Sequence, residues 1–187
     1  GAANLRFGVD AQTSTFSPTL GAGIYGLFRD ATCIVASMTP SGSGTTADPY
    51  LVSVAEELLW ITEDTGRWDQ HYRQTQDIDA GFLDCTYYGE GWRPIGNSEV
   101  AFTGSYDGGD YSIANLQILL PDSTQVGLFG LTNGAVIKNI NLVDFEVTAL
   151  HTAGVLAGQI AGGTQVESVI LTNDTLTTTD FPIANTG

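Results

Sequence analysis

Two pairs of aspartates have a spacing that could bind a cation or move a proton. Asp77 and Asp79 are two residues apart, so their carboxylates share one face if this segment is a strand. Such a pair can hold Ca²⁺, act as an acid and a base, or accept backbone hydrogen bonds where a strand ends. Asp107 and Asp110 flank two glycines, which predicts a tight turn with positive φ. Calcium is therefore the one cofactor considered, at either pair, with turn-forming aspartates as the alternative.

Aromatic rings and acceptors gather a little further along the chain. Tyr87, Tyr88 and Trp92 lie close in sequence to Asp84 and Glu90. Flat rings beside carboxylates can bind a sugar by stacking and hydrogen bonding. This segment is the candidate glycan-binding site.

The cysteines and histidines allow few arrangements. Cys33 and Cys85 can form one intramolecular disulfide, and two separate buried thiols are the alternative. His71 and His151 are far apart, without further ligands at zinc spacing, so both are interpreted as ordinary surface or turn residues.

Charge and composition narrow the class of protein. Of 187 residues, 6 are Lys or Arg and 21 are Asp or Glu, which gives a net charge of −15. This charge repels phosphate backbones and anionic lipids, so nucleic acid is not an expected partner. The longest apolar stretch, residues 20–38, is interrupted by Arg29 and Asp30, so no membrane insertion is expected. Few charges with many Gly, Thr, Ser and Asn residues are typical of secreted β-proteins, which predicts an extracellular or cell-surface location.

Catalysis is not expected from these residues. The six basic residues are scattered, whereas a polysaccharide lyase needs a base and cations against an acidic substrate. A glycosidase needs only two carboxylates, so a polysaccharide-active enzyme stays open as a third possibility.

A repeat organises the second half of the chain. Segments 113–118, 137–142 and 166–171 share apolar first, fourth and sixth positions, with starts 24 and 29 residues apart. Glycine turns precede the second and third copies, at Gly127 and Gly130 and at Gly154 and Gly158, where we expect a sharp turn or closely stacked backbones. Short strands at this period predict an all-β fold, a right-handed parallel β-solenoid, with a β-sandwich as the alternative.

Three regions precede or contain these repeats. Residues 1–40 form an N-terminal strand segment with too few strands for its own core, 41–49 a linker, and 50–187 the solenoid. We predict a helix near 54–63 that caps the first rung, with Ser53 as N-cap and Glu56 completing a capping box. The final Thr186 and Gly187 resemble the start of another repeat, so we expect an open edge there.

Residues 44–187 resemble bacterial surface proteins with GLUG-motif repeats. The resemblance rests on the glycine turns and on a lead-in of short motifs: GTTADPYLV at 44–52, AEEL at 55–58, DID at 77–79, WRPIG at 92–96 and FTGSYDG at 102–108. In that family the tryptophan before Pro-Ile-Gly is a packing residue, which is the alternative role for Trp92. The resemblance implies accessory modules of secreted adhesins, surface layers and exported proteases. It does not extend to residues 1–40, and the turn at Gly154 has one residue more than the pattern.

These observations predict a structural function. We expect an extracellular module of a surface fibre or filament that self-associates through its N-terminal segment and the ends of the solenoid. The alternative is an adhesin module that binds a cell-surface glycan or protein.

Overall fold

The computed structural model describes residues 35–86 and 90–179. The chain divides into two units, Gly1–Thr32 and Cys33–Gly187, and the described residues all belong to the second. The predicted strand segment at 1–40 therefore lies almost wholly outside the described residues.

The described part is built from short strands and one α-helix. In chain order these are β1 (Tyr50–Val52), α2 (Ala55–Thr62), the 3₁₀ helix η1 (Thr65–Arg67), β2 (His71–Gln74), β3 (Ile78–Asp79), the 3₁₀ helix η2 (Gly81–Cys85), β4 (Ser105–Asp107), β5 (Ser112–Ala114), β6 (Gln117–Leu120), β7 (Phe129–Asn133), β8 (Val136–Val143), β9 (Glu146–Ala149), β10 (Ala157–Ala161), β11 (Gln165–Thr172) and β12 (Thr175–Thr178). Over residues 35–86 and 90–179, no helix is long and apolar enough to cross a membrane. The fold is mostly β, as predicted.

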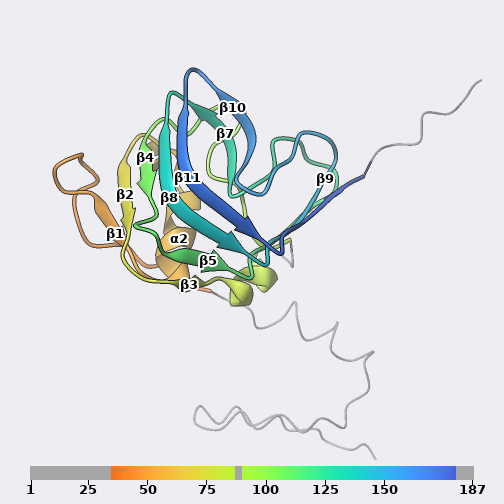
Figure 1. Cartoon of the computed structure of the whole chain (residues 1–187), viewed down its shortest axis with the longest axis horizontal. Coiled ribbons are helices and arrows are strands. Elements are labelled where there is room, and N and C mark those ends of the chain that lie inside the picture. Colours follow the sequence, from red (N-terminus) through yellow and green to blue (C-terminus); the bar gives the residue numbers. More distant parts are fainter. Residues whose placement is uncertain (1–34, 87–89, 180–187) are drawn as a thin grey trace, which may run out of the picture. The chain divides into compact units, whose positions relative to one another are not determined.

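All pairings between these strands are parallel. One sheet has the order β1-β2-β4-β8-β5-β3, with β11 on the other edge of β8; β6, β9 and β12 form a second sheet, and β7 and β10 a third. Figure 1 shows β11 beside β8, and β10 beside β7. Since β10, β11 and β12 each pair with the strand three earlier, the chain returns to every sheet in the same sequence.

The register corrects part of the predicted repeat. Val166 pairs with Ile137, so the spacing of 29 is confirmed. Ile113, however, pairs with Leu142, and Ile137 pairs with Tyr106. The spacing of 24 is therefore wrong, because the apolar pattern of 113–118 matches β8 in two registers and only pairing with the neighbouring strands selects between them.

The core consists of columns of side chains that follow these registers. One column runs Tyr50, Tyr72, Tyr106, Ile137 and Val166. Ring centroids lie 5.6 Å apart in its first step and 6.4 Å in its second, within the range of favourable aromatic pairs. Each column buries apolar surface between successive strands, and this burial is the main stabilising term of the fold.

Helix α2 confirms the predicted helix to within one residue at each end. It begins after Val54 and buries Leu58 and Ile61 completely. The capping residue differs from the prediction: the carboxylate of Glu57, not Glu56, accepts hydrogen bonds from the Ser53 N–H at 2.6 Å and from the Val54 N–H at 3.3 Å. Because the helix starts one residue later than predicted, the third helical position moves to Glu57.

Left-handed residues mark one corner at a constant interval. Asn115, Asp144 and Asn173 have φ of 61°, 55° and 58°. Each lies directly between the two strands that make the corner, and Asn and Asp tolerate this conformation better than other non-glycine residues. The corner recurs every 29 residues, in agreement with the register of β8 and β11.

Candidate functional site

The last three strands have unpaired edges. Strands β10, β11 and β12, here called the terminal strand set, each pair with one neighbour only among the described residues. Their opposite edges therefore present a row of backbone N–H and C=O groups that another strand could pair with.

The same strands expose side chains whose counterparts one step earlier are buried. Val166 is 39% exposed, Leu171 53% and Leu176 46%. The residues paired with them, Ile137, Leu142 and Val147, are at most 1% exposed. The columns of the core thus end in an apolar surface, which has the chemistry of an interior rather than of a solvated face.

Little in the terminal strand set opposes further pairing. Exposed edge strands are commonly protected by Lys, Pro or inward-pointing charges. The sequences AGQIA, QVESVILT and TLTT contain none of Lys, Arg or Pro, and Glu167 is their one charged residue. The arrangement is suited to strand addition.

Asp77 and Asp79 each bind a residue of the next strand and not a common centre. Asp77 Oδ1 accepts hydrogen bonds from the Ser112 N–H at 2.8 Å and the Ser112 hydroxyl at 2.9 Å. Asp79 Oδ1 accepts from the Asn115 amide at 3.0 Å and the Gly81 N–H at 3.1 Å. These hydrogen bonds lower the pKa of both carboxyls below the ordinary value. Both aspartates are therefore seen in the turn-forming role.

The second pair also has separate partners. Burial acts to raise the pKa of Asp107, but hydrogen bonds from the Asn139 amide and the Gly109 N–H, with the charge of Lys138, outweigh it and lower the pKa. Asp110 adopts φ of 66° beside Gly109 at 59°, which confirms the predicted turn. Within residues 35–86 and 90–179, no group of three or more His, Cys, Asp or Glu side chains is placed to hold a metal.

Trp92 lies in the core. Its side chain has no exposed surface, and its indole N–H donates to the Leu128 carbonyl at 3.0 Å. A ring in this position offers no face to a sugar, so the packing role is the one observed. Tyr87 and Tyr88, and the disulfide proposed between Cys33 and Cys85, fall outside the described residues.

The four turn glycines stand where stacked backbones approach closely. A Cβ on Gly127 would lie 2.4 Å from the Gly154 carbonyl oxygen, one on Gly130 2.2 Å from that of Gly96, and one on Gly158 2.4 Å from the Val126 nitrogen. None of them has positive φ, so close approach is the reason for glycine here. The extra residue of the second turn is absorbed between the pairs Val126 with Ala153 and Phe129 with Ala157, whose separations differ by one.

His71 is half-buried between two hydroxyl groups. Its Nδ1 lies 2.7 Å from Ser105 Oγ and its Nε2 3.0 Å from Thr46 Oγ1. A serine and histidine in contact could form part of a nucleophilic site, but here a hydroxyl occupies the position where a carboxylate would stabilise the imidazolium. The contact is a pairing between adjacent strands, since His71 is the register partner of Ser105.

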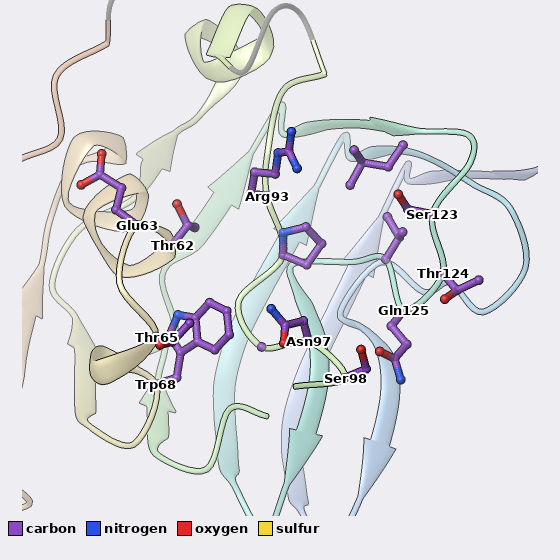
Figure 2. Close-up of a pocket in the computed structure, with 14 residues that line it drawn as sticks. Thr62, Glu63, Thr65, Trp68, Arg93, Asn97, Ser98, Ser123, Thr124 and Gln125 are labelled. Atoms are coloured by element: carbon purple, nitrogen blue, oxygen red, sulfur yellow. The ribbon is translucent and has the colours of Figure 1, made fainter. Parts of the chain in front are cut away.

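A pocket of about 570 Å³ was not predicted from the sequence. It lies between the end of α2 with η1 on one side and the turn that follows β6 on the other, with residues 93–98 between them (Figure 2). Its lining comes from three separate parts of the chain. The nearest signal in the sequence was the Trp92 segment, whose next residues, Arg93 and Pro94, line the pocket.

Comparison with known proteins finds similarity to parts of much longer chains. No family model matches the sequence, and no solved structure matches it. The chain is 37% identical over 140 residues to the halomucin of Haloquadratum walsbyi, covering 73% of this chain and 2% of halomucin. It is 30% identical over 141 residues to a protein of Evansella cellulosilytica described as a Gly-rich membrane protein, covering 74% of this chain and 16% of that protein. The chain is thus a distant homologue of segments of both proteins, and the GLUG-motif resemblance stays a prediction.

Proposed function

We propose that the chain is a structural module of an exported, cell-surface protein, built as a right-handed β-solenoid that associates through its terminal strand set. The observation that carries the proposal is the end of the core columns in exposed Val166, Leu171 and Leu176 on strands with free edges. Full burial of each such side chain would stabilise an assembly by about 1.5–3 kcal/mol.

The solenoid interpretation is supported by the order of the pairings. Three consecutive strands pair in parallel with the three before them, corners recur every 29 residues, and the side-chain columns run through successive strands. Parallel strands in one sheet are connected with a right-handed crossover in about 98% of cases, which favours that hand.

The proposed occupant of the open edge is the N-terminal segment of a second copy. Leu5, Phe7 and Val9 alternate with other residues as in a strand that is buried on one face. At the other end of the columns, α2 packs its buried face against the core beside β1, so that end does not present a matching open layer. Addition of an N-terminal strand is therefore favoured over contact between two solenoid ends, and repetition from copy to copy would form an open fibre.

The cell-surface location is supported by the names of the two similar proteins, a halomucin and a Gly-rich membrane protein. Because the chain covers a small part of either, it supports a module that contributes structure to a larger assembly. The composition, rich in Gly and low in charge, agrees with this location.

Size-exclusion chromatography with light scattering and negative-stain microscopy of the full 187-residue chain would test the proposal. We expect concentration-dependent association and filaments, which Leu171→Lys should abolish by placing a charge on the open face. Leu119→Lys is the matched control: Leu119 is 42% exposed on β6, which pairs on the open side with β9, and its replacement should leave assembly unchanged.

The role of the N-terminal segment needs its own variant. Phe7→Lys combined with Val9→Lys should abolish filaments as Leu171→Lys does, because both remove the same contact from opposite sides. A chain that stays monomeric at every concentration would overturn the proposal. Assembly that survives the N-terminal substitutions but not Leu171→Lys would overturn the proposed occupant.

A further inference from the structure

We propose that the pocket in Figure 2 binds a neutral saccharide unit, a binding function that is independent of assembly. Its volume of about 570 Å³ is within the range of small-molecule sites, which is roughly 300–1,000 Å³. The terminal strand set does not contribute to its lining.

The walls of the pocket are held in place by contacts on the page. The indole N–H of Trp68, a residue 4% exposed, donates to the Ile61 carbonyl at 2.9 Å. The side-chain oxygen of Asn97 accepts from the N–H groups of Glu99 and Val100, both at 2.9 Å, which orders the loop between the two sides. A pocket whose walls are fixed before binding loses less entropy when a ligand enters.

The charged groups of the pocket already have partners. Arg93 pairs with Glu90 at 2.6 Å. Glu63 accepts a hydrogen bond from the Ser37 hydroxyl at 2.6 Å and lies 3.8 Å from Arg67. With these pairs made and a chain of net charge −15, the site does not favour an anion such as a phosphate, a sulfate or a uronate.

The remaining polar lining consists of hydroxyls and amides. They come from both sides of the pocket and from the loop between them: Thr65, Asn97, Ser98, Ser123, Thr124 and Gln125. Hydroxyl and amide groups can both donate and accept, as the hydroxyls of a sugar do. Pro94 and Leu120 add apolar surface beside them, against which the C–H face of a sugar ring can pack. A neutral polyol with one apolar face is the ligand class that fits this set.

Binding of the full chain to an array of neutral, uronic acid-containing and sulfated oligosaccharides would test the inference. We expect binding to neutral members, with affinity measured by calorimetry for those that bind. Thr124→Trp and Ser98→Trp each place a large ring in the pocket and should weaken binding at least tenfold. Gln76→Trp is the control, because Gln76 is exposed and does not line the pocket.

Circular dichroism and the melting temperature would show that each variant is folded, and Leu171→Lys would separate this site from assembly. Binding should be retained in Leu171→Lys even where filaments are lost. The inference is overturned by binding to none of the neutral oligosaccharides, by a preference for the acidic ones, or by equal affinity in Thr124→Trp, Ser98→Trp and Gln76→Trp.

Discussion

Replacement of Gly130 by alanine would test the close stacking of backbones on which the layered core depends. A Cβ at this position would lie 2.2 Å from the Gly96 carbonyl oxygen and 2.8 Å from that of Gln125. Both neighbours are backbone atoms, and Gly130 is itself held by a hydrogen bond from its N–H to the Ile95 carbonyl at 2.9 Å. The methyl group therefore cannot be accommodated by rotation of a side chain.

The expected cost follows from this overlap. Overpacking in a well-packed interior costs about 1–3 kcal/mol, and backbone on two sides of the methyl group places Gly130→Ala near the upper end, at about 3 kcal/mol. For a chain of this size each kcal/mol lowers the melting temperature by about 2–4 °C, so a fall of about 6–12 °C is expected.

Thermal unfolding followed by circular dichroism would measure this fall. Gly66→Ala is the matched control: its Cβ would meet the side-chain oxygen of Asp64 at 3.2 Å in an exposed turn, and neither Gly66 nor Gly130 has positive φ. We expect a change within about 0.5 kcal/mol for Gly66→Ala. Equal melting temperatures for the two variants would refute the reasoning, because close approach would then not limit position 130.

Three further predictions concern polar groups. Thr132→Val should stabilise the fold by about 1 kcal/mol in urea unfolding, since the Thr132 hydroxyl is fully buried without a hydrogen-bond partner, whereas Thr86→Val should destabilise it by a similar amount because the Thr86 hydroxyl bonds the Leu83 and Gly91 carbonyls; a loss of stability in both would contradict this. Trp92→Phe should lower the free energy of unfolding by about 1–3 kcal/mol through the lost indole hydrogen bond and the space left behind, and an unchanged urea midpoint would argue against the buried position of the ring. Because the folded pKa of Asp77 is lowered by its hydrogen bonds from Ser112, its contribution to stability is present above the ordinary value of 3.8 and is lost as the pH falls through the folded pKa; melting temperatures between pH 6 and pH 2 should therefore fall less steeply in Asp77→Asn, and parallel curves would count against the pairing.

Several features of this fold could be predicted from local sequence because local physics decides them. Alternating apolar residues and glycine turns indicated an all-β chain, the strand at Tyr50–Val52 and a helix over 54–63 were placed to within a residue or two, and the Asp107–Asp110 turn was recognised from its glycines. Each depends on propensity, capping or turn geometry within a few neighbouring residues.

Other features required the tertiary structure because they join residues that are distant in sequence. The apolar pattern of 113–118 fits β8 in two registers, and pairing of Ile113 with Leu142 decides between them. The same pairing brings Ser112 to Asp77, a separation of 35 residues that no local pattern reveals. The pocket likewise combines three segments, and its hydroxyls and amides carry no sequence signature individually.

Trp92 shows the division most clearly. Its ring type and acidic neighbours permitted either a sugar site or a core position, since both bury aromatic surface. Only the packing of the Leu128 carbonyl over its indole N–H shows that the ring belongs to the core, while Arg93 and Pro94 face the pocket. The sequence by itself determined which short elements form and where glycine is required, because those depend on neighbouring residues. The tertiary structure decided the register, the open apolar edge and the pocket, because each is made by contacts between strands that the chain reaches only after a further turn of the fold.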